Sequence, residues 1–385
     1  MVRNVCYTAR MEIISNPVEL AKKLVSIRSE SGNEEEVAEY IFEYLKALGL
    51  PAEKLEVDGG RVGDGVAGDR EGDKRRFCVF VAGEGEVLFI NHIDTVPIGE
   101  GWSHDPYGEI VDGKLYGRGS CDNKGSGAAL LAALFPGSFP NICFTIGEEN
   151  TFIGIKTFIK KMAQDARFKN IKYCINLEPT ELKIVHAHKG QIHLTIRAHG
   201  KAAHASDPSK GDNAILKLNE AINNLRKFGD RLAEFEHGLL GRPAMNIGVI
   251  KGGTASNIVP DFAEMEVDVR IVPGQDGKKI VEEIKKVVSP LEVIVNHIYS
   301  PVEMPASSPF IENFRKILKA EGVDSEPEIG GYTTEFSDLA EAGIEGFIFG
   351  AGSINQAHKI DEFVEVGQIE RLCKILCKFL GSRES

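Results

Sequence analysis

Residues 88–97 combine a strand-length apolar run with two side chains that suit metal chemistry. The apolar residues predict a buried strand, and His92 and Asp94 follow at its end, before Pro97. Residues two apart on a strand share one face, so both side chains point the same way. Imidazole is a common metal ligand, and a nearby carboxylate can orient it. Because such pairs also occur in ordinary polar loops, the motif needs support from the rest of the chain.

Ligand-type side chains recur where other predicted elements begin or end. They are Asp122, the pair Glu148 and Glu149, Glu178, and His358. Asp122 opens a predicted helix, so it could simply cap that helix, and the glutamate pair could be an exposed acidic turn. His358 lies in a glycine-containing loop and could be an ordinary surface residue. Sites in α/β sheets lie beyond the carboxyl ends of the strands, so the shared placement favours one site.

Two imidazoles and three carboxylates suit two divalent metal ions, with one carboxylate shared. The expected ligands are His92, Asp122, Glu149, Glu178 and His358. Zinc is the expected metal, while cobalt or manganese fits the same ligand types. Two such ions can activate a water and polarise a carbonyl group. Glu148 is then placed to act as general base, and Asp94 to orient His92. This chemistry indicates amide hydrolysis.

The elements that must position these residues alternate between helices and strands in the first part of the chain. Helices are expected from Pro17 to about Ile27 and from Asn33 to Gly49, the second with a capping box between Asn33 and Glu36. Strands at 77–82 and 87–91 are expected to form a hairpin. Further strands are expected at 141–146, 171–177, 327–331 and 346–349, and further helices at 127–134, 152–162, 309–320 and 368–380. This order predicts an α/β fold with a sheet flanked by helices.

The pattern changes near His186. Alternating strands at 191–198, 245–250 and 262–271, with helices at 213–228 and 275–288, indicate an α+β insert with an open antiparallel sheet. We therefore expect a catalytic domain made of residues 1–186 and 300–385, and an inserted domain made of residues 187–299.

Composition limits the classes of function. The chain has 385 residues, a net charge of −12 and no apolar run that could span a bilayer, so neither nucleic acid nor membrane is an expected partner. Residues 1–10 lack an apolar signal core, which favours a cytoplasmic location, and Met1 and Met11 are both candidate starts. The seven cysteines show no disulfide or zinc spacing, and Cys373 and Cys377 are expected in the core.

The motifs together resemble the di-zinc amidohydrolase/peptidase family, in order and across nearly the whole chain. They are His92-x-Asp94, Gly117-Arg-Gly-x-x-Asp122-x-Lys-Gly, Glu148-Glu149, Glu178-Pro-Thr and Ala357-His358. The resemblance implies a zinc-exopeptidase-like catalytic domain with a mixed sheet, Asp122 as the bridging ligand, and an inserted lid domain that mediates homodimerisation. Asn123 and Ala351 stand where Met and Pro are common in the family, and neither position is a ligand.

Segments around residues 187–190, 203–215 and 350–362 are most similar to the acetylornithine deacetylase branch. By this resemblance, His204 of the lid would reach across a dimer to stabilise an oxyanion, and Arg270 would grip the α-carboxylate of the substrate. Ordinary explanations are a polar turn for His204 and an exposed strand position for Arg270. Further substrate-binding candidates are Lys189, Asn257, Thr333, Thr334 and Glu335, the last facing a distal ammonium group.

The implied reaction is hydrolysis of N-acetyl-L-ornithine to ornithine and acetate in arginine biosynthesis. Alternatives within the family are succinyl-diaminopimelate desuccinylase, a hydrolase of acetyl-lysine or carrier-bound lysine, and a dipeptidase. An inactive metal- or peptide-binding relative is the alternative outside enzymes. Such a relative would be expected to lack Glu148 or a ligand, and all six residues are present.

Overall fold

The computed structural model describes residues 11–57, 75–135 and 137–381, so residues 1–10 and most of the expected loop region at 58–76 lie outside it. The chain divides into two compact units. The first comprises Met1–Val185, Met304–Glu328 and Asp338–Ser385, and the second comprises His186–Glu303 and Ile329–Ser337. The expected boundaries lie at 186/187 and 299/300, and the short segment Ile329–Ser337 packs with the second unit.

A mixed sheet forms the centre of the first unit. Its order is β1 (Ala52–Glu56), β2 (Phe77–Val81), β6 (Asn141–Thr145), β3 (Val87–His92), β7 (Tyr173–Asn176) and β17 (Glu345–Ile348). Val185, the first residue of β8 (Val185–His188), pairs with β17, and the other residues of β8 belong to the second unit. Strands β6, β3, β7 and β17 run parallel, while β1, β2 and β8 pair antiparallel with their neighbours. The carboxyl ends of four central strands therefore meet at one edge.

The predicted hairpin between residues 77–82 and 87–91 is wrong. Strand β6 lies between β2 and β3, antiparallel to the first and parallel to the second. Every residue of β2 and nearly every residue of β3 is buried. A strand that is buried on both faces is most stable in the interior of a sheet, where it has a hydrogen-bonded neighbour on each side. The short glycine turn between β2 and β3 does not show that β6 is the neighbour they share.

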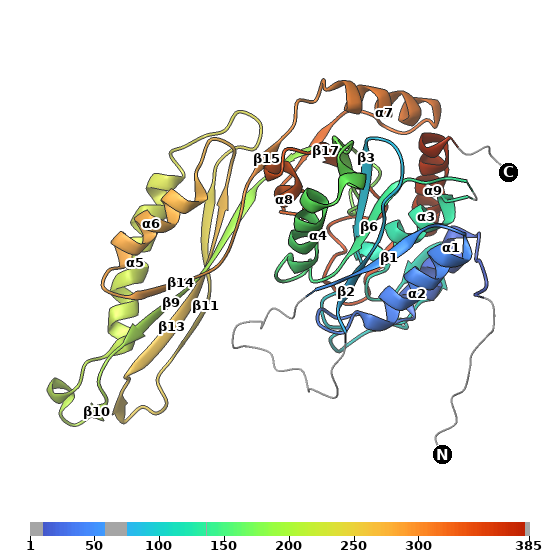
Figure 1. Cartoon of the computed structure of the whole chain (residues 1–385). Coiled ribbons are helices and arrows are strands. Elements are labelled where there is room, and N and C mark those ends of the chain that lie inside the picture. Colours follow the sequence, from blue (N-terminus) through green and yellow to red (C-terminus); the bar gives the residue numbers. More distant parts are fainter. Residues whose placement is uncertain (1–10, 58–74, 136, 382–385) are drawn as a thin grey trace, which may run out of the picture. The chain divides into compact units, whose positions relative to one another are not determined.

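Helices flank this sheet, as the sequence predicts. They are α1 (Pro17–Val25), α2 (Glu35–Ala47), α3 (Gly125–Ala133), α4 (Ile153–Gln164), α7 (Pro309–Ala320), α8 (Phe336–Glu341) and α9 (Val366–Leu380). In Figure 1, α4 lies on one side of β3 and β6, and α3 and α9 lie on the other. A small sheet of β18 (Phe363–Glu365), β5 (Lys114–Tyr116) and β4 (Glu109–Val111) completes the unit.

The two N-terminal helices begin differently. Asn16 caps α1 by accepting from Val18 N and Glu19 N, as expected for Pro at the first helical position. The capping box predicted between Asn33 and Glu36 is wrong, because α2 begins at Glu35 after Glu34. The carboxylate of Glu34 instead accepts from Gly32 N at 2.8 Å and from Arg76 Nη2 at 2.6 Å.

The second unit is an open antiparallel sheet with two helices. The sheet order is β11 (Ala244–Gly252), β13 (Phe262–Ile271), β9 (Gly190–His199) and β14 (Glu292–Tyr299), and the helices are α5 (Ala214–Leu232) and α6 (Gly277–Val288). Apolar residues alternate along β9 and β13 and form one core with both helices. Strand β14 was missed from the sequence. A short pair, β10 (Ala203–His204) with β12 (Ile258–Val259), and β15 (Val302–Glu303), which pairs with β8, also belong here.

The helices and the cysteines differ in how far they match the sequence-based expectations. Among the described residues, no helix has both the length and the apolar character that crossing a membrane requires.

Cys373 and Cys377 on α9 are partly exposed, whereas Cys78, Cys121, Cys143 and Cys174 are buried, and all six are free thiols. The expectation that Cys373 and Cys377 are core residues is therefore wrong, because they lie at the margin of the buried face of α9.

Candidate metal centre

The first unit carries all five predicted ligands at the carboxyl edge of its central strands. His92 ends β3, Glu149 follows β6, and Glu178 follows β7. His358 lies in the loop between β17 and β18. Because these strands are parallel neighbours, positions far apart in the sequence meet at one place.

Asp122 reaches the same edge from an irregular turn, Ser120–Lys124, that leads into α3. Its backbone is not helical (φ −123°, ψ 87°), and the residue that precedes α3 is Lys124, so Asp122 does not cap the helix. The glycines before it allow a close approach. Gly119 has φ +80°, and a Cβ there would lie 2.7 Å from Thr95 Cγ2, so a larger residue would strain the turn and clash.

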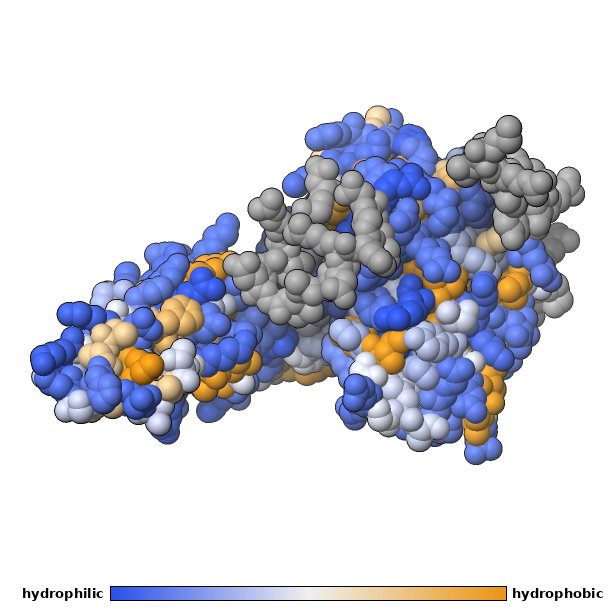
Figure 2. All heavy atoms as spheres, turned by 90° about the horizontal axis from the view of Figure 1, so that it is seen from below, coloured by the Kyte–Doolittle hydropathy of each residue, from blue (hydrophilic) through white to orange (hydrophobic). Residues whose placement is uncertain are grey.

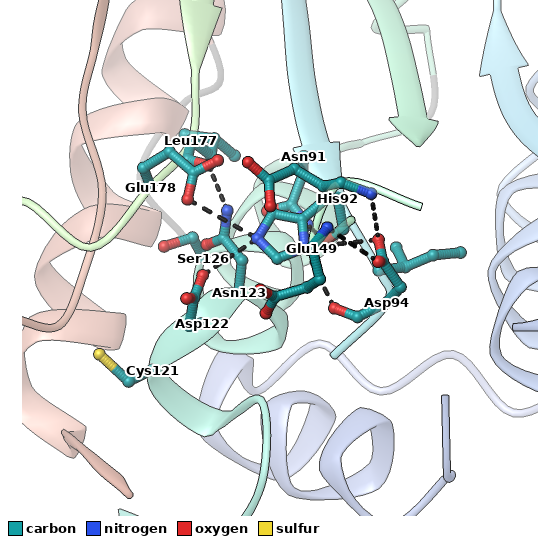
Figure 3. A network of polar contacts seen from close by, with 12 residues as sticks. Asn91, His92, Asp94, Cys121, Asp122, Asn123, Ser126, Glu149, Leu177 and Glu178 are labelled. Atoms are coloured by element: carbon teal, nitrogen blue, oxygen red, sulfur yellow. Dashed lines mark hydrogen bonds and ion pairs between the residues drawn. The ribbon is translucent and has the colours of Figure 1, made fainter. Parts of the chain in front are cut away.

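One ligand group is wholly buried and centres on His92. Its Nε2 lies 3.0 Å from Asp122 Oδ1 and 3.6 Å from Glu178 Oε2. In Figure 3, the His92 ring lies between these two carboxylates on one side and Asp94 on the other. One nitrogen or oxygen from each of the three residues falls within 4.8 Å of the others, a spacing that a single metal ion can span.

The second group shares Asp122 with the first. His358 Nε2 lies 2.8 Å from Glu149 Oε2 and 3.5 Å from Asp122 Oδ2. Asp122 therefore directs Oδ1 to one histidine and Oδ2 to the other, which is the arrangement of a bridging carboxylate. The His358 side chain is 55% exposed, so this half of the centre is open to solvent.

The charges at the centre favour cations. Burial raises the pKa of Glu178 to about 7; His92 opposes this rise, and the charges of Asp122 and Glu149 add to it. Hydrogen bonds with Asp122 and Glu149 raise the pKa of His358 to about 10. At neutral pH these groups hold protons that a divalent ion can replace, and the oxygen and imidazole donors are ones that zinc accepts. The residues present therefore fit a pair of divalent metal ions.

Asp94 supports the centre in a way that the sequence did not indicate. His92 Nδ1 lies 3.1 Å from the Asp94 main-chain oxygen and 3.7 Å from its carboxylate. The Asp94 carboxylate accepts hydrogen bonds from Glu148 N at 3.0 Å and Glu149 N at 3.2 Å. It also accepts one from Ser31 Oγ at 2.6 Å. Asp94 thus holds the turn that carries the candidate base and one ligand, and no local sequence pattern indicates these contacts.

The second unit carries the residues expected to bind substrate, in two separate places. In the first place, Arg270 on β13 donates from Nε to Asp268 Oδ1 at 2.7 Å, and its Nη1 lies 3.5 Å from Thr333 Oγ1. Thr333 Oγ1 in turn donates to the Lys189 main-chain oxygen at 2.8 Å. Arg270, Thr333 and Lys189 therefore form one connected polar cluster.

In the second place, His204 on β10 lies beside Asn257, the residue just before β12. His204 pairs with Ile258, and Ala205 N donates to Asn257 O at 3.0 Å. Both residues are exposed. Thr334 and Glu335 are buried, and the Thr334 hydroxyl accepts from Phe336 N at 3.3 Å. Thr334 and Glu335 are thus packed within the fold, whereas His204 and Asn257 face solvent.

Comparisons with known proteins identify the class. Residues 88–382 match the family model described as peptidase family M20/M25/M40, and the chain belongs to this family. The chain is 30% identical over 364 residues to an acetylornithine deacetylase of Pasteurella multocida (strain Pm70), covering 89% of this chain and 90% of that protein.

Solved structures share the fold. An M20 family metallo-carboxypeptidase from Sulfolobus solfataricus aligns with a TM-score of 0.76 at 19% identity, over 95% of this chain and 99% of that one. A dipeptidase from Saccharomyces cerevisiae aligns with a TM-score of 0.74 at 15% identity, over 96% of both chains. The fold class expected from the sequence is confirmed, and the chain is a hydrolase of a metal-dependent family.

Proposed function

We propose that this protein hydrolyses the amide bond of an N-acyl amino acid, with N-acetyl-L-ornithine as its substrate and ornithine and acetate as products. The observation that carries the reaction class is the pair of ligand groups that share Asp122, with Glu148 beside the ligand Glu149. The choice of substrate is supported by the similarity to the Pasteurella multocida enzyme. An arginine-biosynthetic role and a cytoplasmic location follow from that choice and belong to the proposal.

We propose that His92, Asp122 and Glu178 hold one zinc ion and that Asp122, Glu149 and His358 hold the other, with cobalt as a substitute. Such ions supply Lewis acidity and a water of lowered pKa. Glu148 would accept a proton from the attacking water and deliver it to the leaving nitrogen as the carbon–nitrogen bond breaks. Asp94 fixes the main chain of Glu148 through the 3.0 Å hydrogen bond, so the base is attached to a rigid, buried anchor.

The ring of His204 is oriented by its neighbour Ser206. Its Nδ1 accepts from Ser206 N at 3.1 Å, so Nε2 is the ring nitrogen left to donate. The side chain is exposed, and in the proposal Nε2 donates to the developing negative charge, a contribution worth about 2.7–4 kcal/mol for one donor. In the proposal, Arg270 binds the substrate α-carboxylate, and Asp268 holds its guanidinium in place.

We also propose that the second unit is a lid that forms a homodimer. Strand β11 lies at the edge of its sheet, and Val249 and Ile250 on it are 38% and 56% exposed. Ile215 of α5 lies beside Gly252 of β11, and Leu216 is 64% exposed. Figure 2 shows hydrophobic residues on the surface of this unit. An unpaired edge strand with exposed apolar side chains is suited to pairing with a second copy.

The test is steady-state hydrolysis of a substrate panel by zinc- or cobalt-loaded protein. The panel contains N-acetylornithine, N-succinyl-diaminopimelate, N-acetyl-lysine, N-acetylmethionine and a dipeptide. We expect preference for N-acetylornithine, and a loss of about 10²–10⁴-fold in kcat for Glu148→Gln with unchanged metal content. Glu19→Gln, an exposed carboxylate on α1, is the matched control and should keep full activity.

Each other outcome has a defined meaning. Preference for another panel member, with the same loss in Glu148→Gln, would retain the mechanism and reject N-acetylornithine. Activity that survives both Glu148→Gln and treatment with a chelator would reject the mechanism. A folded, metal-loaded protein that turns over no member of the panel would favour a binding protein.

A further inference from the structure

Glu362 is a buried carboxylate close to the metal centre that belongs to neither ligand group. It is only 1% exposed and lies four residues after His358. Its Oε1 accepts from Cys121 N at 2.9 Å and from Asp122 N at 3.0 Å. Its Oε2 accepts from Arg118 Nη1 at 2.6 Å. One carboxylate therefore ties the segment of His358 to the turn of Asp122, 240 residues away in sequence.

The main chain around Glu362 makes the same connection. Glu362 O accepts from Gly117 N at 3.0 Å, and Val364 and Phe363 of β18 pair with β5 just before the glycine-rich turn. Arg118 is itself held by the Ile98 main-chain oxygen at 3.2 Å. The carboxylate and its counter-charge thus sit in a connected, buried network, which compensates part of the cost of burying both charges.

Both ligand groups contain Asp122 and so touch this network, but their other ligands are held differently. His92 and Glu178 stand at the ends of neighbouring strands β3 and β7, so the sheet ladder fixes their separation. His358 instead lies in a loop, with a left-handed backbone (φ +63°). The separation between His358 and Asp122 therefore needs a constraint outside the central sheet. Glu362, four residues after His358, supplies one through its hydrogen bonds with the Asp122 turn.

We propose that Glu362 is a positioning residue that sets the distance between Asp122 and His358, and so determines the affinity of the Asp122–Glu149–His358 group for its metal ion. Arg118 is its counter-charge. The inference rests on the proposed two-metal site and adds a residue that controls one half of it. Partners that orient metal ligands typically contribute 10- to 100-fold in metal affinity or activity.

The experiment is a calorimetric titration of metal-free full-length protein with zinc. Glu362→Gln keeps the side-chain size but removes the charge and places an amide N–H₂ where donors require an acceptor. We expect one of the two binding steps to weaken by about 10- to 100-fold and the other by less than about threefold. His358→Ala identifies the affected step, since it removes a ligand of the same group.

Asp361→Asn is the matched control. Asp361 is the neighbouring carboxylate, but it accepts from Ser103 N and Ser103 Oγ and has no contact with Asp122 among the described hydrogen bonds. Its φ of +55° also suits asparagine. Both zinc affinities of this variant should stay within about twofold of the wild type. A purely structural role for Glu362 would lower the melting temperature of the metal-free protein and leave the ratio of the two affinities unchanged.

The outcomes separate this inference from the proposed function. Fewer than two zinc ions on the wild type would reject the two-metal site itself. Two ions on the wild type, with an unchanged affinity ratio in folded Glu362→Gln, would overturn only the role of Glu362. If Glu362→Gln does not fold, Glu362→Asp is titrated in the same way. It keeps the charge but withdraws it by one methylene, so an unchanged affinity ratio there also overturns the proposal.

Discussion

Asp94→Asn tests how the turn that carries the base and a metal ligand is held. Asp94 is fully buried, and its Oδ1 and Oδ2 accept from Glu148 N and Glu149 N respectively. Asparagine has nearly the same size but only one carbonyl oxygen. Whichever way the amide is turned, one of the two main-chain N–H groups then faces an N–H₂ group. The turn must shift, or one buried donor stays without an acceptor.

The size of the effect follows from that one lost contact. A hydrogen bond to a charged group contributes about 1.5–3 kcal/mol, and each 1.4 kcal/mol is a factor of about ten. If the lost hydrogen-bond energy raises the activation free energy by the same amount, kcat should fall about 10- to 100-fold. The two ions should still bind, although the ion held by Glu149 should bind more weakly.

The assay is steady-state hydrolysis of the best wild-type substrate, together with the zinc content of each variant. Ser31→Ala is the matched control, because it removes the 2.6 Å hydrogen bond to Oδ2 but leaves an acceptor for both main-chain donors. We expect it to lower kcat by less than about fivefold, because the lost bond does not hold the main chain of Glu148 or Glu149 and its cost falls on folding stability. An Asp94→Asn enzyme within twofold of the wild type, or an equal loss in Ser31→Ala, would refute the reasoning.

Four further predictions use other parts of the molecule. Burial lowers the pKa of His188 to about 4, so the unfolded chain binds an extra proton between pH 6.5 and 4. Stability in urea should fall by up to about 3 kcal/mol across that window, and less in His188→Asn. Burial raises the pKa of Asp338 to about 6, so Asp338→Asn should gain about 1–3 kcal/mol at pH 7.5, and this gain should vanish below pH 4. Ile250→Lys should convert a dimer to a monomer in light scattering, and an unchanged mass would exclude β11 as the interface. Zinc binding at pH 7.5 should release protons, including one from His358 (pKa about 10), measured as a calorimetric heat that depends on the buffer.

The sequence indicated the central strands because they are continuous apolar runs buried on both faces. Ligand-type side chains follow three of them, and parallel strands bring their carboxyl ends to one edge, so proximity could be inferred without knowing the strand order. The order itself was not available. Pairing of β2 with β6 rather than β3 depends on which neighbours bury both faces, and the short turn between β2 and β3 favoured the wrong partner.

The contacts of Asp94 and Glu362 with main-chain amides could not be read from the sequence either. Each depends on tertiary placement: Asp94 meets a turn 54 residues later, and Glu362 meets one 240 residues earlier. Neither contact has a local spacing pattern. Because Asp94 lies two residues after His92, the sequence suggested that its carboxylate orients the His92 ring. In the structure the Asp94 carboxylate is nearer to the main chain of Glu148 (3.0 Å) than to that ring (3.7 Å).

These supporting carboxylates also fix the charge of the centre. Asp94, Asp122, Glu148, Glu149 and Glu178 carry one negative charge each when ionised, whereas the charge of Glu362 is matched by that of Arg118. Two divalent ions would balance four of these five charges. In the absence of metal ions, protons take their place, because burial raises the pKa of Glu178 to about 7 and hydrogen bonds with Asp122 and Glu149 raise the pKa of His358 to about 10. The contacts of Asp94 and Glu362 hold the main chain, so the ligand carboxylates stay close together although they repel one another. A second divalent ion relieves this repulsion, which favours its binding.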